Sequence, residues 1–154
     1  MFTGKYFVEK LNMKEHPEGG YYNECLKSGD IIDAKTVDSS FDGNRKLWTS
    51  IYFLLKDRDV SRFHRLKSDE IWYYHSGVPM VIHIINKNGE LERVKLGLDI
   101  ERGERPQVLI PKGCIFGAIM LKENIFTLQY LFAFILIITG VVIGINSKAK
   151  KEKI

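Results

Sequence analysis

Residues with acid–base chemistry gather in one stretch of the chain, residues 61–77, which reads SRFHRLKSDEIWYYHSG. Within it, His64 and Glu70 lie on either side of a short polar turn. An imidazole can accept a proton near neutral pH, and a buried carboxyl group can orient that imidazole or have a raised pKa of its own. The stretch therefore predicts a site for proton transfer or for binding a polar ligand.

The segments around this turn have the composition of β-strands, and Gly77 with Pro79 ends the second of them. Successive side chains of a strand point to opposite faces, so residues 70–75 form two sets. One set holds Glu70, Trp72 and Tyr74, and the other holds Ile71, Tyr73 and His75. One set faces the interior of a small barrel, and the sequence does not decide which.

Short strand-like segments continue on both sides, separated by Gly, Pro and Asn-Gly turns. The expected strands are 48–55, which is apolar enough to be central in its sheet, 70–74, 80–85, 91–98 and 107–110. A short helical or irregular lead-in precedes them. This pattern predicts an all-β sandwich or barrel.

Charge and cysteine content exclude several classes of protein. The net charge is +4, but residues 148–154 hold four lysines and one glutamate, which leaves +1 for the rest of the chain. Positive and negative charges therefore nearly cancel outside the tail, which does not favour nucleic acid as a partner. Cys25 and Cys114 have neither the number nor the spacing of a disulfide framework or a zinc site, and they fit a reduced intracellular setting. The N-terminus lacks the continuous apolar run of a secretory signal.

Two motifs give the chain a resemblance to a known family. Residues 16–22 read HPEGGYY, and residues 68–72 read SDEIW. His64, Glu70 and Gly77 also fit positions of the first cupin motif, G-x5-H-x-H-x3/4-E-x6-G. In these features the chain resembles a cupin family of unassigned function. The resemblance implies a double-stranded β-helix, the cupin jelly-roll barrel, over residues 1–123 and a homodimer formed through that domain, but no known reaction.

The same resemblance bears on metal binding, because cupin metal sites use three histidines and a glutamate. Leu66 stands where the second histidine belongs, and Phe116 stands where the histidine of the second cupin motif belongs. His75 or His83 could substitute, although a single histidine on a strand is more often packed and hydrogen-bonded. We therefore expect neither a bound metal nor another cofactor.

Three functions remain open. The first is binding of a small polar ligand, of the nucleotide or sugar-nucleotide type, inside the barrel. Its candidate residues are Arg62, His64, Glu70, Trp72, His75 and Gln107. The second, by similarity to cupin sugar epimerases, is a metal-independent isomerase or epimerase in which a tyrosine is the acid. Its candidate catalytic residues are His64, Glu70, Tyr73 and Tyr74.

The structural alternative to both is that His64, Arg65, Asp69 and Glu70 simply form a salt-bridged turn. The third function is a truncated or frame-shifted cupin with no activity. The end of the chain bears on this reading, because it departs from the family pattern. Residues 124–147 carry no charge, and 128–145 are nearly all apolar. That run is long enough to predict a transmembrane helix, followed by a basic tail at 148–154. Membrane association through 128–145 would then tether a cytoplasmic body, whereas paired strands there would leave the protein fully cytoplasmic.

Overall fold

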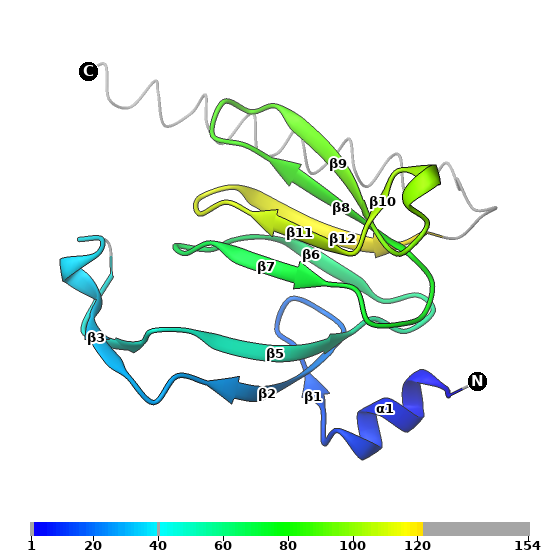
Figure 1. The fold of residues 1–154 in the computed structure, drawn as a ribbon, viewed down its shortest axis with the longest axis horizontal. Coiled ribbons are helices and arrows are strands. Elements are labelled where there is room, and N and C mark those ends of the chain that lie inside the picture. Colours follow the sequence, from blue (N-terminus) through cyan, green and yellow to red (C-terminus); the bar gives the residue numbers. More distant parts are fainter. Residues whose placement is uncertain (1, 40, 122–154) are drawn as a thin grey trace. The chain divides into compact units, whose positions relative to one another are not determined.

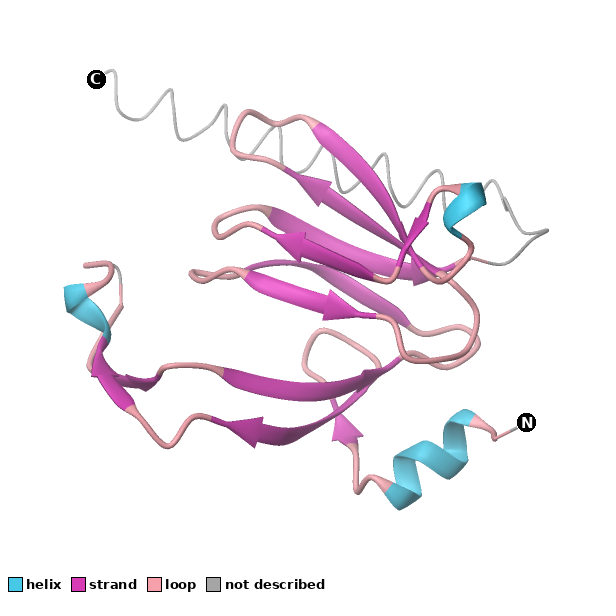
Figure 2. Ribbon diagram, in the orientation of Figure 1, coloured by secondary structure: helices cyan, strands magenta, loops and turns pink. Residues whose placement is uncertain are grey.

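The structure is a computed structural model that describes residues 2–39 and 41–121, which lie within one compact unit, Met1–Leu121. Figure 1 shows the order of its elements, and Figure 2 shows that most of them are strands. They are α1 (Gly4–Lys10), β1 (Lys14–Glu15), β2 (Tyr21–Lys27), β3 (Ile31–Asp33), the 3-10 turn η1 (Ala34–Thr36), β4 (Asn44–Lys46), β5 (Thr49–Leu54), β6 (Val60–Arg65), β7 (Glu70–Tyr73), β8 (Met80–Ile85), β9 (Leu91–Leu96), the 3-10 turn η2 (Ile100–Arg102), β10 (Glu104–Arg105), β11 (Gln107–Ile110) and β12 (Ile115–Met120).

The strands form an all-β fold, as the sequence predicts. The largest sheet has the order β10-β9-β8-β12-β6, and it is antiparallel except for the short parallel pair β10–β9. A second sheet has the order β1-β2-β5, β7 pairs with β11, and β3 pairs with β4. In Figure 1 the β7–β11 pair overlaps β6 and β12 of the large sheet, and the β2–β5 ribbon is drawn below them.

The core follows the alternation that strands impose on their side chains. On β8 the buried residues are Ile82 and Ile84, and on β11 they are Val108 and Ile110. Phe116 of β12 is 1% exposed and, among the residues that the structure describes, is the largest fully buried side chain. Burying each such side chain stabilises the fold by about 1.5–3 kcal/mol. These buried side chains form the packed core against which the neighbouring polar groups lie.

The predicted strands 80–85 and 107–110 are confirmed, and the Asn-Gly turn between β8 and β9 places Gly89 at φ 84°. The expectation that 48–55 is a central strand is wrong for the described residues. There β5 ends its sheet, and Ile51 and Tyr52 are 38% and 40% exposed. Local apolar composition predicted a strand correctly, but the position of a strand within a sheet depends on long-range pairing.

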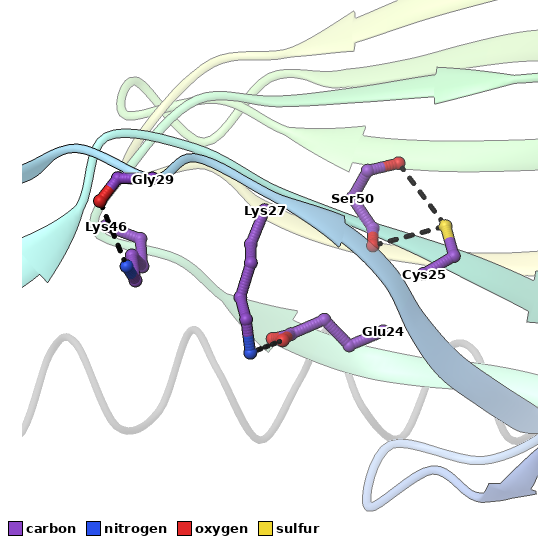
Figure 3. Close-up of polar contacts among 6 residues, drawn as sticks. All are labelled: Glu24, Cys25, Lys27, Gly29, Lys46 and Ser50. Atoms are coloured by element: carbon purple, nitrogen blue, oxygen red, sulfur yellow. Dashed lines mark hydrogen bonds and ion pairs between the residues drawn. The ribbon is translucent and has the colours of Figure 1, made fainter.

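Side chains on β2 and β5 form polar contacts in the second sheet (Figure 3). Cys25 lies at the register shift between the two strands, and its Sγ donates to the carbonyl oxygen of Ser50 at 3.4 Å. Lys27 Nζ lies 3.0 Å from Glu24 Oε1 on the exposed surface. Cys25 and Cys114 are both free thiols, and Cys114 is buried.

The predicted hydrophobic segment, residues 124–147, and the basic tail 148–154 lie outside the described residues. Across residues 2–39 and 41–121, every helix is too short or too polar to cross a membrane.

Candidate functional site

The orientation of β7 settles which of its faces points inward. Glu70 and Trp72 are half-buried, whereas Ile71 and Tyr73 are 52% and 57% exposed. The cause is the pairing with β11, where the residues opposite Glu70 and Trp72 are buried apolar side chains. The Glu70 face therefore belongs to the interior of the barrel.

His64 reaches the same interior from β6, which pairs with β12 and not with β7. The pairing sets His64 opposite Phe116, and the two ring centroids are 4.2 Å apart. His64 Nδ1 lies 2.7 Å from the carbonyl oxygen of Arg62. A carbonyl oxygen only accepts hydrogen bonds, so Nδ1 carries a proton, and in the neutral ring Nε2 is left with a lone pair.

Glu70 is a carboxyl group held in partly apolar surroundings. Trp72 Nε1 donates to Glu70 Oε1 at 2.7 Å. Burial raises the pKa of Glu70, while the Trp72 hydrogen bond and the nearby His64 act in the opposite direction. The rings of Phe53 and Phe116 lie 5.3 and 6.3 Å from that of Trp72, so aromatic groups surround this carboxyl group and its donor.

His16 is a member of this cluster that the sequence analysis did not place in the site. Its ring lies edge-on to Tyr22 at 4.8 Å and to Phe53 at 5.4 Å. Burial lowers the pKa of His16, as does the neighbouring His64, against a smaller opposite effect of Glu18. The HPEGGYY motif could have identified His16, because it places a histidine next to a glycine-containing loop. The proximity of His16 to His64 could not be predicted, because the two residues are far apart in the sequence.

The ring of His16 has the opposite hydrogen-bonding arrangement to that of His64. The backbone N–H of Glu18 donates to His16 Nδ1 at 3.1 Å. A neutral His16 therefore carries its proton on Nε2 and acts there as a donor. Two half-buried histidines thus contribute one donor and one acceptor to the same region of the interior.

The loop 16–20 reaches this position because it docks on β6. The backbone N–H of Arg62 donates to the Glu18 carbonyl oxygen at 2.7 Å, and the Arg62 guanidinium donates to the Pro17 carbonyl oxygen. Gly19 has φ 103°, and an added Cβ there would overlap the carbonyl oxygen of Val60. In this structure Arg62, predicted to bind ligand, holds the histidine-bearing loop.

The structure places the other predicted site residues elsewhere. Tyr73 and Gln107 are cross-strand partners on the exposed face of the β7–β11 pair. His75 is exposed beyond the end of β7, with its ring 6.2 Å from that of Tyr52. The Tyr74 hydroxyl donates to the carbonyl oxygen of Gly77. Burial raises the pKa of Tyr74, as does Glu104. The structure therefore brings together His64, Glu70 and Trp72 of the predicted set.

The side chains present do not fit a cupin metal centre. Leu66 packs against the apolar core, and buried Phe116 covers one side of His64. His16 cannot supply a lone pair from Nε2 while Nδ1 accepts from Glu18. Within residues 2–39 and 41–121, no three His, Cys, Asp or Glu side chains lie close enough together to hold a metal ion.

The site is an arrangement of two imidazoles and one carboxyl group, bordered by the rings of Tyr22, Phe53, Trp72 and Phe116. Aromatic faces pack against sugar or base rings, and the polar atoms can form directed hydrogen bonds with hydroxyl, carbonyl or amide groups.

Comparisons with known proteins place this chain in a family. Residues 5–146 match the model of the family described as Cupin superfamily (DUF985), so the match includes most of the segment predicted to depart from the family. A solved structure of a protein from Shewanella oneidensis is 45% identical, with a TM-score of 0.70, and the alignment covers 79% of this chain and 72% of that one. A hypothetical protein from Leishmania major is 34% identical, also with a TM-score of 0.70, over 81% of this chain and 73% of that one.

A curated relative, an uncharacterised protein of Saccharomyces cerevisiae, is 26% identical over 123 residues. That alignment covers 76% of this chain and 60% of the yeast protein, so the chain spans less than two thirds of that relative's length. The family match, the two structural relatives and the all-β jelly-roll architecture agree: the chain belongs to the cupin superfamily, in the family of unknown function described as DUF985.

Proposed function

We propose that the cluster formed by β6, β7 and the loop 16–20 binds a small polar ligand of the nucleotide or sugar-nucleotide class. The observation that carries this proposal is the complementary pair of histidines, with a donor on His16 and an acceptor on His64. Half-buried polar groups lose hydration unless they are hydrogen-bonded, so a ligand with both hydroxyl and carbonyl groups would offset that cost. The aromatic rings around them suit the flat face of a base or sugar.

Tryptophan fluorescence tests the proposal, because the chain has two tryptophans in different surroundings. Trp72 donates to Glu70 inside the cluster, whereas Trp48 is 51% exposed. In a Trp48→Phe variant, emission reports Trp72 alone. We expect UMP, UDP-glucose or dTDP-glucose to change that emission saturably. No change with any member of a broad nucleotide and sugar-nucleotide panel would count against the proposal.

A second candidate is a metal-independent isomerase or epimerase, which the complementary tautomers of the two neutral rings favour. In such a reaction His64 Nε2 would take a proton from a carbon next to a carbonyl group. The electron pair would move to the carbonyl oxygen, toward which His16 Nε2–H would donate. Tyr22 lies beside His16, so it replaces Tyr73 and Tyr74 as the candidate acid that would return a proton. Incorporation of solvent deuterium into a bound keto-sugar nucleotide, lost in His64→Asn, would distinguish this enzyme from a binding module.

We also propose that the full chain associates with membranes through 128–145, with the body on the cytoplasmic side, and that it dimerises through residues 1–123. The support for membrane association is the length of the uncharged run, and the support for a dimer is the resemblance to the cupin family.

A further inference from the structure

A surface groove of about 360 Å³ lies at the turns that join the strands, and none of its lining residues belongs to the His64–Glu70 cluster. Its lining includes four cationic side chains, Arg65, Lys67, Lys87 and Lys112, and a single carboxylate, Asp38. These five side chains carry a net charge of +3, whereas residues 1–147 as a whole carry +1. Positive charge is therefore concentrated here and not spread over the surface.

Three of the cations lie in turns between strands, and Arg65 is the last residue of β6. Lys67 lies between β6 and β7, Lys87 between β8 and β9, and Lys112 between β11 and β12. The Gly113 N–H donates to the Leu66 carbonyl oxygen at 2.9 Å, and the Lys112 N–H donates to Asp69 Oδ1 at 2.8 Å. The first and third turns therefore keep a fixed spacing.

Gly113 makes room for the second turn. It has φ 81°, and an added Cβ would lie 3.0 Å from Lys87 Cε, so the lysine stem passes directly over this glycine. Lys112 Nζ forms an ion pair with Asp38 Oδ2 at 3.0 Å. Leu66 forms the apolar part of the lining.

We propose that this groove binds a phosphate group of a small anionic molecule. Cationic side chains held close together repel one another, and a dianion placed between them removes that repulsion and gains charge-assisted hydrogen bonds. Lysine is a flexible point charge suited to phosphate, and Arg65 adds a planar group that can donate two parallel hydrogen bonds. The volume lies in the range of small-molecule sites.

The test uses the full chain, with pyrophosphate as the probe, at low ionic strength. The double variant Lys67→Met/Lys87→Met removes two charges and keeps two apolar stems. Its matched control is Lys5→Met/Lys10→Met on exposed α1, which makes the same change in net charge away from the groove. Backbone amide NMR reports the location of binding, and unchanged spectra outside the turns show that each variant folds.

We expect pyrophosphate to shift the Gly113 and Lys112 amide resonances saturably. The groove variant should bind pyrophosphate about tenfold or more weakly, and the control less than about twofold more weakly. The reason is that a hydrogen bond between charged groups contributes more binding free energy than the screened attraction of distant charges. Absence of a saturable shift would overturn the proposal, as would equal weakening in both variants. Binding of a single-stranded oligonucleotide through these residues without binding of pyrophosphate would also contradict it and indicate a nucleic-acid surface.

Discussion

At the scale of single residues, Glu70 and His64 were recognisable from sequence because both occupy positions of a known motif. Which face of β7 turned inward was not recognisable, since both sets of alternating side chains contain aromatic and ionisable members. Packing decided it, through the buried partners that β11 places opposite Glu70 and Trp72. His16 was missed for a related reason: its contact with the cluster depends on a loop that docks from a distant part of the chain.

The pH dependence of stability tests the surroundings of Glu70. Burial raises its pKa, so its favourable contribution is fully present below its unfolded pKa and is lost as the pH rises through the folded pKa. Glu70→Gln removes the titration and keeps an oxygen that accepts from Trp72. We expect the melting temperature of the variant relative to the natural protein to increase from pH 4 to pH 7.

Thermal unfolding across that range measures the difference, and Glu92→Gln, at an exposed carboxylate of β9, is the matched control. A difference that stays constant with pH for Glu70→Gln, or one equal to that of the control, would show that burial does not govern this carboxyl group.

Metal content is the second prediction at this scale. Because Leu66 and Phe116 are apolar and His16 Nδ1 accepts from the backbone, we expect less than about 0.1 transition-metal ion per chain after purification. Elemental analysis measures this quantity. About one Fe, Mn, Ni or Zn per chain, lost in His64→Ala, would require a different arrangement of these side chains.

At the scale of elements, the docking of loop 16–20 on β6 connects the motif to the site. The loop presents His16, and β6 presents both His64 and the backbone groups that hold the loop. Composition and turn residues predicted β8, β11 and the turn after β8, since those depend on local sequence. Sheet order depends on pairings between distant segments, and so the exposed position of β5 did not follow from its apolar sequence.

Gly19→Ala tests this docking. The new Cβ would overlap the Val60 carbonyl oxygen, and φ 103° is strained for alanine, so we expect a loss of about 1–3 kcal/mol in the free energy of unfolding. Gly29→Ala is the matched control, because an added Cβ there meets nothing within 4 Å. Urea denaturation measures both. Equal stability of the two variants would mean that the loop does not approach β6 this closely.

At the scale of the whole molecule, the proposed membrane association rests on the composition of the apolar segment 128–145. Each Leu, Ile, Phe or Val contributes about −0.3 to −0.6 kcal/mol on insertion at mid-bilayer, and a lysine costs about 2.5–3.5 kcal/mol there. We therefore expect the full chain to sediment with membranes and to resist extraction by high salt. The double variant Ile137→Lys/Ile138→Lys should shift it to the soluble fraction, whereas Lys5→Met/Lys10→Met should not. Natural protein that remains in the high-speed supernatant would instead assign this segment to the domain itself.

The central claim is that the interior cluster of His16, His64 and Glu70 binds a polar ligand. The most direct measurement compares the same substitution at an interior and an exterior histidine, His64→Asn and His75→Asn, by calorimetric titration with UDP-glucose, dTDP-glucose and UMP. Losing a hydrogen bond in a partly buried site should weaken binding by about tenfold, whereas exposed His75 should tolerate the change within about twofold. We predict that at least one of these ligands binds and that only the His64 variant loses affinity. Binding that survives His64→Asn, or that is lost equally in both variants, would contradict the claim.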